Sequence, residues 1–155
     1  MIRTVYRKDI SDSEIFDRIN ETFGKSPVIM TPEKNDFKEL ERYVKHGLTH
    51  IKISYHVFDD YWNEAILVLP ENLNKTEQAP AVVVTHGTNG IQGKYGMLDP
   101  EGNPNRSYAI ELAKRGFVTI SPDQYGFGSS MENPEYKQKF ENFYNDYPQW
   151  SLMSR

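Results

Sequence analysis

The sequence predicts an α/β fold in which an antiparallel hairpin precedes a parallel strand–helix–strand unit. Residues 49–57 alternate between apolar and polar side chains, which is typical of a half-buried strand, and residues 64–69 can return beside them. Residues 81–85 are largely apolar and β-branched without alternation, as in a strand buried on both faces of a parallel sheet. An amphipathic helix over residues 105–115 and an apolar strand over 117–120 complete the unit, whose crossover should be right-handed.

The first 48 residues are expected to form a helical extension, separate from the domain over 49–155. Ser11 and Glu14 have the spacing of a capping box, and Gly24 is a natural C-terminal stop, which together predict a first helix. A second helix is predicted over residues 31–47, with an apolar stripe of Phe37, Leu40 and Val44.

Length and composition exclude several classes of protein. The chain has 155 residues, 37% of them hydrophobic and 26% charged, which suits one globular core. A net charge of −4 without a dense basic face argues against a nucleic-acid partner. The absence of cysteine excludes disulfides and a cysteine nucleophile. No signal peptide or spanning segment is recognisable, so we expect no membrane partner and a cytoplasmic location.

A glycine-bearing loop, His86-Gly87-Thr88-Asn89-Gly90, follows the first predicted parallel strand. Open parallel sheets bind ligands at the carboxyl ends of their strands, and glycines let backbone N–H groups approach a ligand closely. Such donors can stabilise a developing oxyanion. His86 itself is interpreted first as a hydrogen-bonded core residue, and second as a group with a chemical role.

A second loop, over residues 121–129, follows the next predicted strand. Asp123 could be a catalytic acid there, but a role as acceptor of backbone hydrogen bonds that fix the loop is favoured. Aromatic residues in and after this loop could line an acyl or sugar pocket, although packing against the sheet is the preferred interpretation. They are Tyr125, Phe127, Tyr144, Tyr147 and Trp150.

Taken together, residues 80–90, 105–117 and 121–129 resemble the α/β-hydrolase superfamily. The likeness is to its dienelactone-hydrolase and acetyl-xylan-esterase-like branches, of the prolyl-oligopeptidase type, and it covers roughly residues 49 to 155. It implies the N-terminal portion of an α/β-hydrolase sheet. It also implies a parent enzyme that hydrolyses a small-molecule ester or related acyl compound with a serine nucleophile, and no metal or organic cofactor.

The same resemblance implies roles for particular residues. The Thr88 backbone N–H corresponds to one oxyanion-hole donor, within a catalytic loop that includes His86 and Gly87. Further binding residues are expected at Asn89, Gly90, Asp123 and Tyr125.

The nucleophile is the main departure from the family pattern. Gly-x-Ser-x-Gly does not occur in these 155 residues, and the last histidine in the chain is His86, whereas the family order is nucleophile, acid, then histidine. We therefore expect a chain truncated before the nucleophile strand and catalytically incomplete.

Two alternatives to an enzyme remain open at this point. The chain could be a non-catalytic binding or interaction module, or one half of a split hydrolase that folds with a complementing C-terminal half. In the family sheet the strand at 82–84 has neighbours on both sides. An unpaired edge there predicts poor solubility or self-association.

Overall fold

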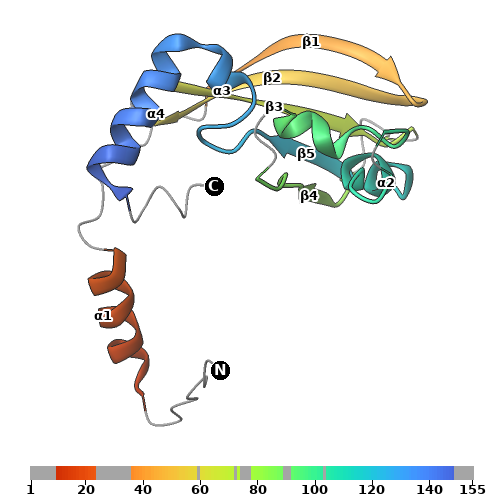
Figure 1. The fold of residues 1–155 in the computed structure, drawn as a ribbon. Helices are drawn as coiled ribbons and strands as arrows, with labels where there is room; N and C mark the ends of the chain where they lie inside the picture. Colours follow the sequence, from red (N-terminus) through yellow and green to blue (C-terminus); the bar gives the residue numbers. More distant parts are fainter. Residues whose placement is uncertain are drawn as a thin grey trace.

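The computed structural model describes residues 10–23, 36–58, 60–71, 73, 78–88, 92–102 and 104–148. Within these ranges a five-stranded sheet has the order β1-β2-β3-β5-β4 (Figure 1). The strands β1, β2, β3 and β5 are antiparallel to their neighbours in turn, whereas β4 runs parallel to β5. The strands are β1 (Phe37–Lys45), β2 (Leu48–Phe58), β3 (Tyr61–Leu69), β4 (Ala81–Val83) and β5 (Val118–Pro122).

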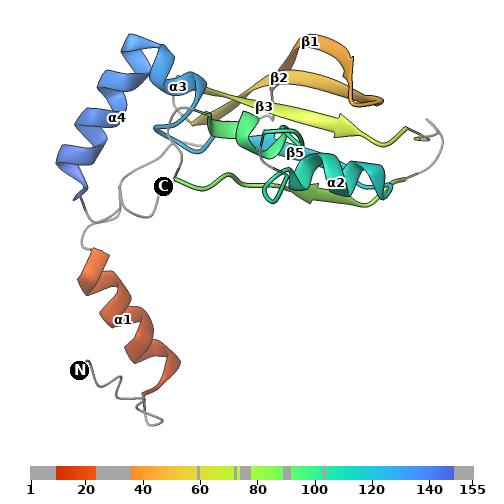
Figure 2. The same ribbon diagram turned by 45° about the vertical axis from the view of Figure 1, so that its right-hand side comes forward.

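Within the described ranges, five helical segments accompany the sheet. Helix α2 and the 3₁₀ helix η1 lie together against the β5 region, whereas α3 and α4 lie at the far end of the long β2–β3 hairpin (Figures 1 and 2). Their bounds are α1 (Asp12–Phe23), η1 (Gly93–Met97), α2 (Tyr108–Lys114), α3 (Ser129–Glu132) and α4 (Pro134–Asp146). The antiparallel hairpin and the parallel strand–helix–strand unit of the predicted α/β fold are thus confirmed.

The hydrophobic core lies between the sheet and α2. Ala109, Ile110 and Ala113 form one face of this helix, and none is more than 1% exposed. Tyr108 at the start of the same helix is 53% exposed. Burying apolar surface stabilises by roughly 25 cal/mol per Å², so this cluster is the main support of the parallel unit. The cluster consists of Leu48, Ile66, Val68, Val84, Met97, Leu98, Ala109, Ile110 and Ala113.

The predicted second helix is wrong over its larger part, because residues 37–45 form strand β1. A β-bulge between Glu39 and Glu41 inserts one extra residue relative to β2. In a regular strand two residues seven apart face opposite sides, but the bulge brings Phe37 and Val44 to the same side. The bulge therefore produces the spacing of a helical stripe. The rest of the predicted helix before Asp36 lies outside the described residues.

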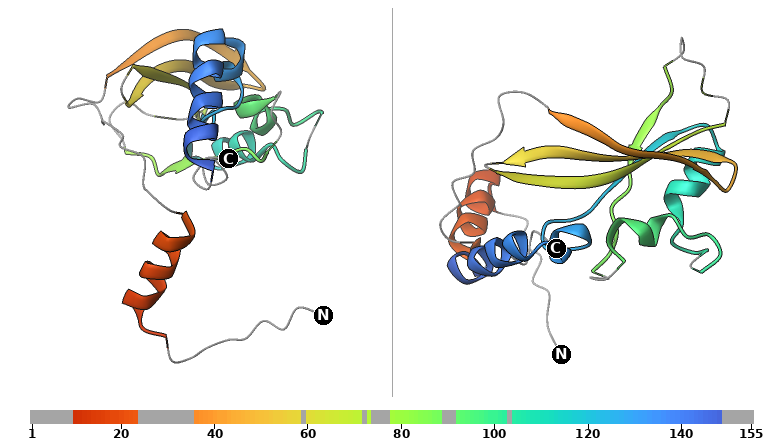
Figure 3. Two further views of the ribbon diagram at one scale, coloured as in Figure 1. Left: turned by 60° about the vertical axis from the view of Figure 1, so that its left-hand side comes forward. Right: turned by 90° about the horizontal axis from the view of Figure 1, so that it is seen from above.

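Helix α1 confirms the first predicted helix. The Ser11 hydroxyl accepts the Glu14 backbone N–H at 3.3 Å, as the capping box requires. The helix stands clear of the sheet in Figure 1 and in the left view of Figure 3. Its apolar side chains Ile15, Phe16 and Ile19 are accordingly 44%, 66% and 43% exposed. Among the described residues no helix is both long and apolar enough to cross a bilayer.

Strand β4 forms one edge of the sheet. It pairs with β5 on one side, and no described strand lies on the other. Val83 is consequently 64% exposed. An exposed apolar strand edge can pair with another chain, so the predicted unpaired edge is present within the described part of the chain.

Candidate functional site

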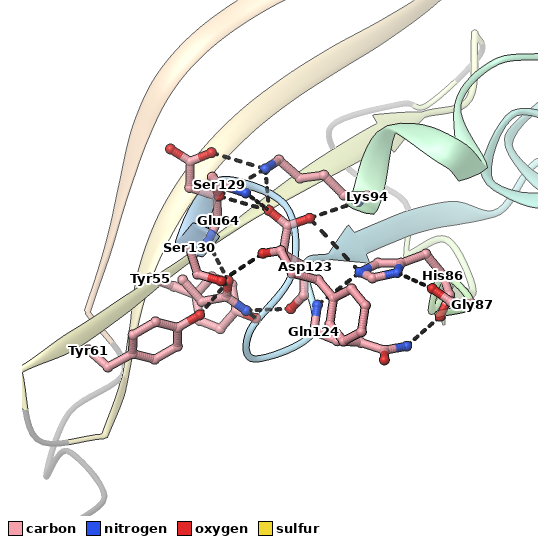
Figure 4. Close-up of polar contacts among 12 residues, drawn as sticks. Tyr55, Tyr61, Glu64, His86, Gly87, Lys94, Asp123, Gln124, Ser129 and Ser130 are labelled. Carbon is pink, nitrogen blue, oxygen red and sulfur yellow. Dashed lines mark hydrogen bonds and ion pairs between the residues drawn. The ribbon is translucent and has the colours of Figure 1, made fainter. Parts of the chain in front are cut away.

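The segments that follow β4 and β5 meet at the carboxyl ends of these two parallel strands (Figure 4). The backbone N–H of Gln124 donates to Nε2 of His86 at 3.0 Å. In return, the side-chain amide of Gln124 donates to the His86 carbonyl oxygen. This reciprocal pair joins the two loops directly and fixes the position of His86.

Both ring nitrogens of His86 are occupied within the protein. Because Nε2 accepts a hydrogen bond from the Gln124 backbone N–H, the ring hydrogen lies on Nδ1, which donates to the Gly87 carbonyl oxygen at 2.7 Å. His86 is 4% exposed, and its ring makes an edge contact with Phe127, with centroids 5.5 Å apart. These contacts agree with the preferred interpretation of His86 as a hydrogen-bonded core residue.

Thr88 lies at the surface beside an open cleft of about 580 Å³. No hydrogen bond among the described residues uses the Thr88 backbone N–H. The cleft contains one cation, Arg106, and no carboxylate among its described lining. The lining residues are Thr85, Gly87, Thr88, Met97, Arg106 and Tyr108. A partly negative ligand oxygen therefore meets favourable electrostatics here.

A buried ion pair joins η1 to the loop that follows β5. Lys94 is 1% exposed and Asp123 is 3% exposed, and Nζ of the lysine lies 2.5 Å from Oδ2 of the aspartate. The Lys94 backbone N–H also donates to Oδ1 of Asp123 at 2.7 Å. The Ser129 N–H and hydroxyl both donate to Oδ2, at 3.0 and 2.8 Å. The prediction that Asp123 accepts backbone hydrogen bonds and orders its loop is confirmed.

The ion pair continues toward the surface as a row of alternating charges. Nζ of Lys94 lies 3.1 Å from Oε2 of Glu64, and the same oxygen lies 3.0 Å from Nζ of Lys52. Two cations and two anions therefore alternate from the partly exposed Lys52 to the buried Asp123. Each buried charge has an opposite charge beside it, as burial in a low-dielectric interior demands.

The pKa values of both carboxyls in this row respond to the same two effects. Burial favours the neutral form of Asp123, but hydrogen bonds and charge from Lys94, with help from Ser129, outweigh it and lower the pKa. For Glu64 burial acts in the same direction, and Lys52 and Lys94 together again lower the pKa. Both groups are therefore held as carboxylates at neutral pH.

Stability should decrease in acid because of these two groups. A carboxyl with a lowered folded-state pKa contributes stability that is present above its unfolded value of about 4 and is lost as pH falls through the folded value. We expect the melting temperature to fall steeply below about pH 4. At neutral pH the Asp123→Asn variant should have a lower melting temperature than the wild type. Its melting temperature should also decrease less as the pH is lowered, as measured by circular dichroism. An equal slope in both proteins would contradict this assignment.

Tyr125 lies in an aromatic cluster and does not reach the cleft. Its ring makes edge contacts with Phe58 and Tyr61, with centroid distances of 5.5 and 5.0 Å. It also contacts Phe140 and Phe143 of α4, at 5.4 and 5.8 Å. Burial raises the pKa of its hydroxyl. The packing interpretation of this residue is the one that the structure supports.

The structure therefore brings together only part of the predicted site. His86, Gly87 and Asp123 lie in one region (Figure 4), and Thr88 lines a cleft together with Gly87. Asn89 and Gly90 lie outside the described residues. Sequence reasoning missed Lys94 and Gln124. Their partners are 29 and 38 residues away along the chain, so no local pattern could have revealed them. No group of three or more potential metal-ligating side chains occurs in the ranges that the structure describes.

Comparison with known proteins supports the fold. No protein-family model matches the chain, and no curated protein matches it. A similar solved structure is the crystal structure of "a putative acetyl xylan esterase" from Bacteroides fragilis NCTC 9343, with a TM-score of 0.55 and 16% sequence identity. The similarity covers 96% of this chain and 44% of that chain, so this chain spans less than half of its structural neighbour. At this identity the likeness supports the α/β fold and nothing finer.

Proposed function

We propose that this chain is the oxyanion-binding part of a serine-hydrolase-type acyl hydrolase that acts on small-molecule esters or related acyl compounds. One observation carries the proposal: Thr88 lines an open cleft, and the peptide that bears its N–H has its carbonyl held by a buried histidine. A donor that is fixed before the reaction stabilises an oxyanion without any cost of reorganisation. One such donor contributes about 2.7–4 kcal/mol of transition-state stabilisation.

The proposal includes catalytic incompleteness of these 155 residues. An acyl hydrolase of this type needs an attacking serine and a histidine base. Gly-x-Ser-x-Gly is absent from the sequence, and His86 uses both ring nitrogens within the protein. The chain therefore offers part of the oxyanion site, and the nucleophile, the base and the second donor have to come from elsewhere.

An esterase assay tests this proposal. The purified chain should hydrolyse p-nitrophenyl acetate at the background rate, and a fluorophosphonate probe should label no serine. An authentic serine esterase in the same buffer serves as the positive control. Turnover that titrates with the probe would show that a complete serine site exists in this chain and would refute the proposal of incompleteness.

The exposed edge of β4 supports a proposal about partners. We propose that this edge pairs with a complementing C-terminal half, or with a second copy when that half is missing. The supporting observation is the open, apolar edge at Val83. A non-catalytic binding module is the alternative, in which the Thr88 cleft would retain a small acid without converting it.

A charge placed on this edge should reduce self-association. Lysine on an edge strand disfavours pairing with another strand. We expect Val83→Lys to lower the apparent mass in light scattering coupled to size exclusion. Val44→Lys, a change at a 74% exposed residue on the opposite edge strand β1, is the matched control. A monomeric wild-type chain, or equal effects of the two variants, would contradict association through β4.

A further inference from the structure

We infer that His86 is a positioning residue that fixes the direction of the Thr88 N–H. We also infer that the loop after β5 holds the His86 ring in the tautomer that this role requires. The Gly87 carbonyl, which accepts from Nδ1 of His86 at 2.7 Å, belongs to the same peptide unit as the Thr88 N–H. A trans peptide is planar, and its C=O and N–H point in opposite directions. A ring that holds the carbonyl on one side therefore directs the N–H to the other.

Only one form of the imidazole can hold the peptide in this way. Nδ1 has to carry the hydrogen, since a carbonyl cannot donate. The Gln124 backbone N–H selects this form, because it donates to Nε2 at 3.0 Å and would repel a hydrogen there. Gln124 thus acts on the Thr88 amide through the ring of His86, without touching Thr88 itself.

The position of Gln124 is in turn fixed by its neighbour Asp123. The carboxylate of Asp123 is bonded to Lys94 and Ser129, and its backbone carbonyl accepts from Nδ2 of Asn63 at 2.7 Å. Adjacent residues of one loop therefore hold the chain on both sides of residues 89–91. Gln124 acts on His86 before that segment, and Asp123 acts on Lys94 after it.

This geometry distinguishes a positioning role from that of a catalytic base. A base needs a free ring nitrogen within reach of substrate. Nε2 of His86 instead accepts from the Gln124 N–H and lies 4.0 Å from Oδ1 of Asp123, and the side chain is 2% exposed. The ring has no open path to a bound ligand, so its influence passes through the Gly87 peptide.

The histidine tautomer is the first test, and it requires no variant to fold. Magic-angle-spinning ¹⁵N NMR of histidine-labelled chain works on monomers and on associated material alike. We expect a neutral His86 ring with its hydrogen on Nδ1, identified by the loss of that signal in His86→Asn. A neutral ring with hydrogen on Nε2, or a doubly protonated ring at neutral pH, would overturn the inference.

A pair of variants provides the second test. The side-chain amide of asparagine can place an N–H near the position of Nδ1, whereas leucine offers no donor. We expect the Gly87 carbonyl ¹³C resonance to shift upfield in His86→Leu and to stay near its wild-type position in His86→Asn. Strand signals from Ile66 and Val68 report whether each variant is folded. An unchanged Gly87 signal in a folded His86→Leu chain would refute the positioning role.

Acetate binding separates this inference from the proposed function on which its catalytic meaning rests. Titration with acetate, followed at the Thr88 amide, should show an affinity at least about tenfold weaker in His86→Leu than in wild type, as expected for loss of one hydrogen bond to a charged group. His86→Asn should recover most of that affinity. If wild type does not bind acetate, the oxyanion proposal fails, while the tautomer and the carbonyl signal still decide the positioning role. Wild-type binding that both variants retain unchanged would contradict the inference.

Discussion

The variant Lys94→Met should lose about 3–5 kcal/mol of unfolding free energy, which is the usual cost of leaving one member of a buried ion pair uncompensated. Lys94 is 1% exposed and contacts Asp123 and Glu64 through one ammonium group. Methionine has a similar shape but cannot donate, so the carboxylate of Asp123 would remain buried without its cation. Urea denaturation at pH 7, followed by circular dichroism, measures the loss.

An exposed ion pair provides the matched control for this prediction. Lys114 pairs with Glu111 at 3.3 Å, and the two side chains are 49% and 50% exposed. Lys114→Met should change the unfolding free energy by less than about 1 kcal/mol. The double variant Lys94→Met with Asp123→Leu should recover part of the single-variant loss, because both buried charges are then absent. Equal losses for the Lys94 and Lys114 variants would show that the buried pair contributes little.

A methyl group at Gly128 should be nearly as damaging. A Cβ atom there would lie 2.1 Å from Oδ1 and 2.5 Å from Oδ2 of Asp123, and the residue has φ +56°, which favours glycine. The carboxylate cannot move aside, since Lys94 and Ser129 hold both of its oxygens. Overpacking and backbone strain together predict a loss of about 2–5 kcal/mol for Gly128→Ala in the same denaturation experiment.

A variant at Gly47 separates the contribution of backbone strain from that of overpacking. This turn glycine has φ +75°, but a Cβ atom there would meet nothing within 4 Å. Gly47→Ala should therefore show only the strain of a left-handed backbone, about 1–2 kcal/mol. If both alanine variants lose the same amount, the close contact between Gly128 and Asp123 has no energetic consequence.

The parts of the fold that were predictable are those with a short-range signal. Alternation predicted the β2–β3 hairpin, and the apolar run at 81–85 together with the stripe of α2 predicted the parallel unit. The local pattern of β1 predicts a helix because one bulge residue converts a two-residue period into an apparent helical one. Its pairing with β2 is a long-range interaction that decides between two locally acceptable conformations.

The candidate site also contains some residues that the sequence predicts and others that it does not. Glycines and strand ends marked the Thr88 loop and Asp123 from sequence, since backbone geometry at such positions restricts residue type. No sequence pattern near Lys94 predicts that its charge is buried. Because lysine is almost never fully buried without a partner, its burial depends on residues elsewhere in the chain. Its partners are Glu64 on β3 and Asp123 in the loop after β5, 30 and 29 residues away, so the pairing becomes visible only when the fold is assembled.

The alternating charges at positions 52, 64, 94 and 123 also restrict which substitutions this sequence can accept during evolution. A neutral residue at 94 leaves an aspartate stranded in the interior, and a neutral residue at 123 strands the lysine, so neither step is tolerable before the other has occurred. Chains that descend from a common ancestor with this one should accordingly keep both ions or replace both with apolar residues. Position 52, at the partly exposed end of this row of charges, should vary freely among such chains.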